Sequence, residues 1–269
     1  LDQNYSDVEI IIVDDSDRPI FDEIGERYSD LSNVRVVRGD PPDDTYIPDA
    51  HARKKGVELS EGTYVSFLDS DDTWEETRLT THVEIWERHP NIGFTWDKWA
   101  ARKESENSSH VRGDIDVGSR TDPSPVLDRG ENYRILDGDF LANVLWLNSN
   151  FIHMSAGFTS REALMSIGNV PIRGLCDWHM WILLASNFDV GIVDEVLTTK
   201  NLDGDRLDHE TYHTRRSEVD THISRWKLLP DRNLGKYHEW SEICPAALYQ
   251  NWLFAANLFG MLRHHIGNL

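Results

Sequence analysis

The sequence holds few cysteines, few lysines and no long apolar segment, and each shortage narrows the class of protein. Its 269 residues include only two cysteines, Cys176 and Cys244, which cannot form a disulfide framework and favour a reducing cytoplasm. No run of ~18 apolar residues is present that could span a bilayer. The 27 basic residues are outnumbered by 47 acidic ones, and the net charge of -20 repels nucleic-acid backbones. We therefore expect a cytoplasmic protein that binds no nucleic acid.

The residue types that are abundant indicate a folded domain of enzyme size. Hydrophobic residues make up 39% of the chain and include 10 Trp, 9 Phe and 8 Tyr, which is enough apolar surface to fill a core. The basic residues comprise 20 Arg and only 7 Lys. Together with the acidic excess, this bias suits a protein that stays soluble in concentrated salt, where charges are strongly screened. We interpret it as the mark of a halophilic source.

Strand and helix signals alternate along the first part of the chain. Aliphatic runs predict strands at 8–13, 34–37 and 64–68. Helical periodicity is present at 19–28, 50–59 and 75–88. This alternation predicts an α/β fold, in which helices flank a central sheet.

Two later segments differ in character from this pattern. Residues 103–132 are polar and lack periodicity, which predicts a surface excursion rather than a domain. Strand and helix signals then continue to about residue 205, and the remainder has a helical pattern. We expect one α/β domain over residues 1–205 and a helical C-terminal extension over residues 206–269.

Pairs of the form Asp-x-Asp are frequent, so their context decides which of them has a function. Five occur, whereas the composition alone predicts about three. Only Asp69 and Asp71 follow a complete apolar strand, and Asp72 comes directly after them. Open α/β sheets bind ligands at the carboxyl ends of strands, where carboxylates can hold a divalent cation beside a diphosphate. The alternative is a solvated acidic loop in an acidic protein.

A second strand end carries Asp14, Asp15 and Ser16, and a short helix carries Arg53. A carboxylate at this edge can accept hydrogen bonds from a nucleotide base or a ribose, and Arg53 can bond to a base carbonyl or a phosphate. The alternatives are a turn that begins at Asp14 and a solvated face of the helix. We predict that these residues line the same crevice as Asp69.

Asp177 is the candidate general base. It lies far downstream of the acidic motif around Asp69, so its carboxylate could approach a hydroxyl nucleophile from the side of the acceptor substrate and remove its proton. Its position before an apolar helical segment equally suits an N-cap. If Asp177 is only a helix N-cap, Asp194 or Glu195 is the next candidate for the general base. Three histidines, at positions 153, 179 and 209, are too scattered to indicate a zinc site, and we interpret each as structural.

Two of the motifs also resemble families that we weigh as alternatives. Residues 10–16 resemble the opening of response-regulator receiver domains, but the chain lacks the Lys-Pro pair that those domains require. Residues 67–73 resemble the Asp-x-Asp-x-Thr motif of haloacid-dehalogenase-type phosphatases, whose later Lys and acidic pair have no convincing counterpart in this chain. Neither resemblance extends beyond its motif.

A third resemblance covers most of the chain. It rests on Gln3-Asn4-Tyr5, Glu9 to Ser16, Ala52-Arg53-Lys54-Lys55-Gly56, Gly62 to Trp74, Ser160 to Leu164, and Gly174 to Trp178. In order and spacing these segments resemble family 2 glycosyltransferases with the GT-A fold. The resemblance implies a Rossmann-like, mixed and mostly parallel sheet flanked by helices, and we expect the strands at 8–14, 34–38 and 63–68 to share it. It further implies a nucleotide-sugar half over 1–99 and an acceptor half over 100–205.

The resemblance also implies a reaction and its residues. A hexose passes from a UDP- or GDP-linked donor to an acceptor hydroxyl, with inversion at the anomeric carbon. Asp69, Asp71 and Asp72 would hold Mg²⁺ or Mn²⁺ and the diphosphate, and Asp177 matches the general base of the family. Cys176 stands where the family usually has Glu.

The chain departs from the family's pattern at its start, because members normally carry a further strand and helix before the segment that matches Gln3-Asn4-Tyr5. We expect that the chain begins inside a longer gene product. The same departure motivates an alternative function, a non-catalytic module that binds nucleotide sugars or assists assembly.

The acceptor is expected to be a saccharide or a lipid-linked saccharide. Residues 246–262 form an apolar helical stripe that includes Trp252 and Phe259, and polar residues within it exclude a membrane span. We expect this stripe to pack on its own domain. Peripheral contact with the inner face of the cell membrane is the alternative.

Overall fold

The computed structural model describes residues 2–15, 21–39, 48–103, 105, 107–115, 124–147, 150–170 and 176–202, and the statements below concern these residues. Ser16, His209, Cys244 and the predicted extension over 206–269 lie outside them. The described part contains no helix that is long and apolar enough to cross a membrane.

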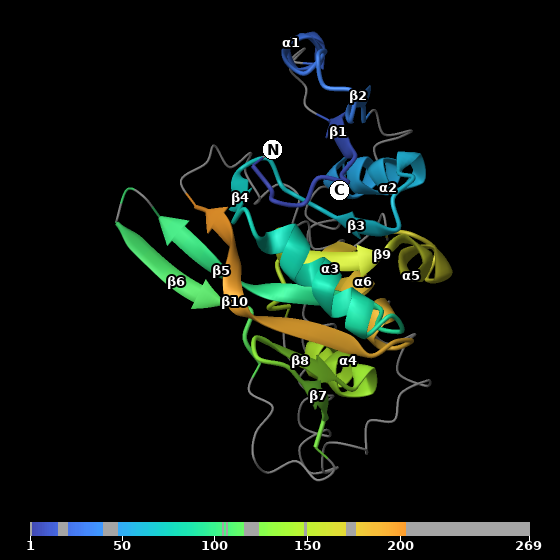
Figure 1. Ribbon diagram of the computed structural model, residues 1–269, viewed down its shortest axis with the longest axis vertical. Helices are drawn as coiled ribbons and strands as arrows, with labels where there is room; N and C mark the ends of the chain where they lie inside the picture. Colours follow the sequence, from blue (N-terminus) through green and yellow to red (C-terminus); the bar gives the residue numbers. More distant parts are fainter. Residues whose placement is uncertain are drawn as a thin grey trace, which may run out of the picture.

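Strands and helices alternate as the sequence predicts. The strands are β1 (Ile10–Asp14), β2 (Val34–Arg38), β3 (Tyr64–Ser66), β4 (Asp72–Trp74), β5 (Phe94–Lys103), β6 (Ser108–Arg112), β7 (Val126–Arg129), β8 (Tyr133–Leu136), β9 (Gly157–Ser160) and β10 (Val190–Asn201). The helices are α1 (Phe21–Arg27), α2 (Pro48–Leu59), α3 (Arg78–Arg88), α4 (Gly138–Leu147), α5 (Arg161–Ser166) and α6 (Cys176–Ala185), with a short 3₁₀ helix, η2 (Met154–Ala156). A central sheet flanked by helices confirms the predicted α/β class (Figure 1).

The sheet is mixed, but the expectation that it is mostly parallel is wrong. The large sheet has the order β3-β9-β5-β10-β8-β7, with β4 added to β10 and β6 added to β5. Among the described strands only β1–β2 and β5–β10 pair in parallel. The hairpins β5–β6 and β7–β8 have short turns, which allow only antiparallel pairing. Strand β9 also enters between β3 and β5 and runs antiparallel to both.

The first three strands do not share one sheet, contrary to expectation. Strands β1 and β2 pair with each other, whereas β3 takes its hydrogen bonds from β9 in the large sheet. A side chain rather than a strand ladder links the two parts: Glu9 Oε1 accepts hydrogen bonds from the backbone N–H groups of Glu61 and Gly62, at 2.5 and 2.6 Å. The segment that leads into β3 is thereby fixed beside β1.

Helices cover both faces of the large sheet. Figure 1 shows α3 crossing in front of the strands, where its apolar side chains form one core with Phe158 and Val193. Helices α4 and α6 pack against the opposite face, in a second core that includes Phe94 and Trp96. Because side chains alternate along a strand, Asp97 of β5 points to the α3 face instead.

A buried charged network ties α3 to this sheet. The fully buried Arg78 donates from Nε to Asp97 Oδ1 at 2.7 Å, and His82 Nε2 lies 3.1 Å from the same oxygen. The other ring nitrogen of His82 lies 2.7 Å from Thr95 Oγ1. Burial and the Arg78 charge lower the pKa of His82 to about 4, despite its hydrogen bond to Asp97. His82 is therefore neutral in the folded protein at neutral pH.

Candidate active site

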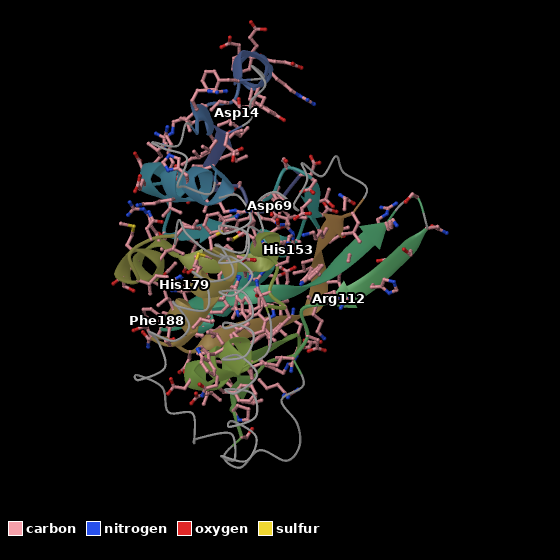
Figure 2. The ribbon with its side chains drawn as sticks, turned by 180° about the vertical axis from the view of Figure 1, so that it is seen from behind. Asp14, Asp69, Arg112, His153, His179 and Phe188 are labelled. Atoms are coloured by element: carbon pink, nitrogen blue, oxygen red, sulfur yellow. The ribbon has the colours of Figure 1, made fainter. Side chains whose placement is uncertain are left out.

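Two of the predicted aspartates and a histidine lie close together beside the large sheet. Asp69 follows β3, Asp72 opens β4, and His153 directly precedes η2. One ligand atom from each lies within 4.8 Å of the other two, and Figure 2 shows the labelled Asp69 and His153 close together. We call Asp69, Asp72 and His153 the acidic cluster.

Asp72 is the most buried member of the acidic cluster. Its side chain has no exposed surface. Its Oδ2 atom accepts a hydrogen bond from Ser155 Oγ at 2.6 Å and contacts His153 Nε2. Its Oδ1 atom is buried and has no hydrogen-bond partner among the described residues. A buried carboxylate oxygen without a hydrogen bond lowers the stability of the folded protein. A cation bound to this oxygen would offset that cost.

Asp69 is held in its ionised form by cations around it. Its Oδ1 atom accepts a hydrogen bond from Arg53 at 2.7 Å. Burial alone would raise its pKa, but the charge and hydrogen bond of Arg53, with the charges of His153 and Lys200, outweigh burial and hold the pKa of Asp69 below its usual value. The backbone N–H of Asp69 also donates to Ser155 Oγ at 3.0 Å.

The other described residues that were predicted to bind the metal or the nucleotide are not members of the acidic cluster. Asp71 is exposed, and its backbone carbonyl accepts a hydrogen bond from Asn201 at 2.7 Å. The nearly buried Asp14 bonds to Arg38 at 3.0 Å, while Asp15 is exposed. Figure 2 shows Asp14 on β1, away from Asp69 and His153. Metal binding by Asp71 and nucleotide binding by Asp14 and Asp15 remain predictions.

Asp177 lies in the first turn of α6, which begins at Cys176 rather than after Asp177. One of its oxygens accepts a hydrogen bond from Asn150 Nδ2 at 2.9 Å, and the other accepts one from the adjacent Trp178 N–H at 2.7 Å. An N-cap would instead bond two or three residues ahead. Arg53 connects this helix to the acidic cluster, because its second terminal nitrogen lies 3.4 Å from Cys176 Sγ.

The two residues considered as substitutes for Asp177 have other partners. Asp194 forms a two-pronged ion pair with Arg134, at 2.6 and 3.0 Å. Glu195 accepts a hydrogen bond from Asn132 at 2.6 Å. Both therefore have structural contacts of their own.

His153 and Ser155 are the site residues that the sequence does not reveal. His153 stands 81 positions after Asp72, and no spacing rule links them. Ser155 is fully buried and bonds to both aspartates of the acidic cluster. The pairing of β4 with β10 and the course of η2 over the sheet bring these segments together, which requires the tertiary structure.

The donor set of the acidic cluster fits a divalent metal ion. It offers two carboxylates and an imidazole nitrogen, and one oxygen of the Asp72 carboxylate is buried without a hydrogen bond from the described residues. The fold and this site define an α/β protein with a group of side chains beside its large sheet that could hold a metal ion. Comparison with known proteins is specific: the sequence profile "Glycosyl transferase family 2" matches residues 1–167. The chain belongs to this family.

Curated relatives match part of the chain. The amylovoran biosynthesis glycosyltransferase AmsB of Erwinia amylovora is 36% identical over 91 residues, which cover 32% of this chain and 29% of the relative. The glucosyl-dolichyl phosphate glucuronosyltransferase of Haloferax volcanii is 31% identical over 107 residues, or 38% of this chain and 33% of the relative. The chain thus matches about a third of the length of these relatives.

A solved structure shows the same fold. Residues 1–349 of S. aureus TarS, crystallised with UDP, superpose on 96% of this chain and 64% of theirs with a TM-score of 0.58 and 14% identity. At this identity the likeness concerns the fold alone. It identifies the mixed sheet flanked by helices as GT-A-type.

Proposed function

We propose that the chain transfers a hexose from a nucleoside-diphosphate sugar to an acceptor hydroxyl, with inversion at the anomeric carbon and with a bound divalent cation. The acidic cluster is the observation that carries this proposal, because it combines cation ligands with a link through Arg53 to the helix of Asp177. Family membership and the names of the relatives support the reaction. The UDP complex of TarS supports a nucleotide donor, for which UDP and GDP are both candidates here.

The charges at the site suit a cation together with an anionic donor. Asp69 and Asp72 supply negative charge, while Arg53 and Lys200 act on Asp69 as positive charges. When bound, Mg²⁺ or Mn²⁺ would neutralise charge on the leaving diphosphate. Arg53 can exchange its bond to Asp69 for one to a phosphate oxygen. In this proposal Asp14 and Asp15 bind the nucleoside, and Asp71 remains a candidate third carboxylate.

Asp177 acts as the general base. The Asn150 amide fixes one of its oxygens, which supports a defined orientation of the carboxylate when it accepts the proton of an incoming hydroxyl. As the acceptor oxygen bonds to the anomeric carbon, its proton passes to Asp177 and the bond from that carbon to the diphosphate oxygen breaks. A single displacement of this kind inverts the configuration, and no covalent intermediate with the enzyme is formed.

The test compares two aspartates in matched positions. Asp177 and Asp139 both lie in the first turn of a helix, α6 and α4 respectively. Asp177→Asn should keep UDP or GDP binding in calorimetry and lower the transfer rate by about 10²–10⁴-fold, whereas Asp139→Asn should transfer normally. Near-normal transfer by Asp177→Asn would place the base elsewhere. Metal-dependent nucleotide binding without transfer to any acceptor would favour the non-catalytic alternative.

The same proposal divides the chain into a part that binds the donor and a part that binds the acceptor, and it names a class of acceptor. Residues 1–99 would bind the donor, residues 100–205 the acceptor, and residues 206–269 would form a separate extension. The name of the Haloferax volcanii relative, which includes a dolichyl phosphate, supports a lipid-linked acceptor, and a soluble saccharide is the alternative. Flotation with liposomes tests whether the protein contacts a membrane peripherally.

A further inference from the structure

We propose that His153 is a ligand of the cation through Nε2, and that this nitrogen makes the site select Mn²⁺ over Mg²⁺. The inference rests on the proposed function, since it concerns the same cation. It gives His153, which lies outside the acidic motif, the role of a metal ligand. It also predicts which cation the site prefers, which the aspartates alone do not.

The position of Asp72 is the first argument. Its Oδ2 atom already has two neighbours, Ser155 Oγ and His153 Nε2, while its buried Oδ1 atom has no hydrogen-bond partner in the part of the chain that the structure describes. A structural ion pair between His153 and Asp72 would explain the first oxygen but not the second. A cation bound in the acidic cluster would provide a partner for this second oxygen.

The fixed position of His153 is the second argument. Its side chain is only 9% exposed, and its ring centroid lies 5.2 Å from that of Trp99. Its backbone carbonyl accepts the hydrogen bond from Ala156 N–H that closes the η2 turn. Both the ring and the backbone are therefore positioned before any ligand binds, which reduces the entropy lost on binding.

The nitrogen determines which cation is preferred. Mg²⁺ is a hard cation that takes oxygen ligands almost exclusively, in octahedral geometry. Imidazole suits Fe²⁺, Ni²⁺, Cu²⁺ and Zn²⁺ best, and Mn²⁺, which also accepts carboxylate oxygens, is the first and weakest member of the series along which affinity for a nitrogen-containing site rises. A site with two carboxylates and one imidazole therefore gains affinity for Mn²⁺ that it does not gain for Mg²⁺.

Ser155 is the positioning residue of this site. Its hydroxyl donates to Asp72 Oδ2 at 2.6 Å and accepts from the Asp69 N–H at 3.0 Å, so one side chain fixes both aspartates. Groups that orient metal ligands in this way typically change metal affinity by about 10–100-fold when they are removed.

The experiment measures Mn²⁺ binding to the full chain without nucleotide. Electron paramagnetic resonance counts free Mn²⁺ during a titration, Mg²⁺ is added as competitor, and electron spin-echo modulation detects a coordinated ¹⁴N nucleus. The wild type should bind Mn²⁺ at least about tenfold more tightly than Mg²⁺ and show ¹⁴N modulation. His153→Phe, which keeps a ring against Trp99, should lose the modulation and most of the preference. His89→Phe is the matched control and should retain both, because His89 lies outside the acidic cluster, next to Tyr133.

A second pair of variants tests the role of Ser155. Ser155→Ala should weaken Mn²⁺ binding by about tenfold or more and shift the Mn²⁺ spectrum. Ser66→Ala removes a nearby hydroxyl that bonds to Gly157 and Arg78, and it should leave Mn²⁺ binding unchanged. Equal effects of the two substitutions would reduce Ser155 to a structural role.

The outcomes separate this inference from the proposed function. Tight Mn²⁺ binding with no ¹⁴N modulation in the wild type, or with modulation that survives in His153→Phe, overturns the role of His153 and leaves cation-assisted transfer intact. Modulation in the wild type supports the inference even if His153→Phe fails to fold. Absence of any cation binding, together with transfer that needs no metal, overturns both.

Discussion

His82 should make the stability of this protein fall when the pH drops from 7 to 5. Its ring is fully buried, contacts Asp97 and lies near the Arg78 charge, and its pKa in the folded state is about 4, against 6.5 for the free side chain. Because the folded pKa lies below the unfolded one, the contribution of His82 is complete above pH 6.5 and is lost as the pH falls toward 4. Between these values the unfolded chain binds one more proton than the folded chain.

The size of the effect follows from the two pKa values. At ~1.4 kcal/mol per pH unit, the interval from 6.5 to 5 removes about 2 kcal/mol from the free energy of unfolding. Urea unfolding at pH 7, 6 and 5 and at constant salt measures this loss as a shift of the midpoint. His82→Gln can still bond to Asp97 and Thr95, so we expect it to be less stable at pH 7 but to lose much less than the wild type between pH 7 and 5. His89→Gln is the control and should keep the wild-type pH dependence.

If His82→Gln loses as much stability as the wild type between pH 7 and 5, other groups carry the pH dependence. If the wild type loses less than about 0.5 kcal/mol, the ring is protonated in the folded state or is not desolvated as its burial indicates.

Three further substitutions test contacts around the site. Arg53→Met should tighten Mn²⁺ binding in the absence of nucleotide by about fivefold and weaken UDP or GDP binding, because it removes a positive charge 2.7 Å from Asp69; calorimetry with each ligand measures both. Gly157→Ala should destabilise the protein by roughly 1–3 kcal/mol in urea unfolding, since its Cβ would lie 2.2 Å from the Trp181 ring. Arg78→Met should cost about 3–5 kcal/mol in the same assay, because it leaves a buried carboxylate without its main partner.

The sequence predicts the acidic part of the site because that part is local. An apolar strand that is followed within a few residues by Asp69 places the aspartate near the strand's carboxyl end, whatever the neighbouring strands are. The burial of Asp72 and the exposure of Asp71 depend instead on β4, whose pairing with β10 turns alternate side chains inward. Which aspartate faces the cluster could therefore not be predicted from the motif.

Strand direction is the feature of the fold that the sequence predicts least well. A buried apolar run is compatible with parallel or antiparallel neighbours, because both bury the same side chains. The expectation of a mostly parallel sheet came from the family resemblance, and β9 overturns it by entering between β3 and β5. The neighbours of β9 are decided by packing between residues that are distant in sequence.

Arg53 gives the site a property that none of its motifs suggests. One guanidinium contacts Asp69 at 2.7 Å and Cys176 Sγ at 3.4 Å, and Cys176 is the first residue of the helix that carries Asp177. The family's usual Glu at position 176 would offer Arg53 a second carboxylate, and a charged partner there would compete with Asp69. A thiol competes only weakly, so Asp69 keeps the guanidinium in the absence of ligand. In the proposed function, a diphosphate that bonds to Arg53 would compete with both of these contacts, and donor binding would then be coupled to the position of the proposed base on α6.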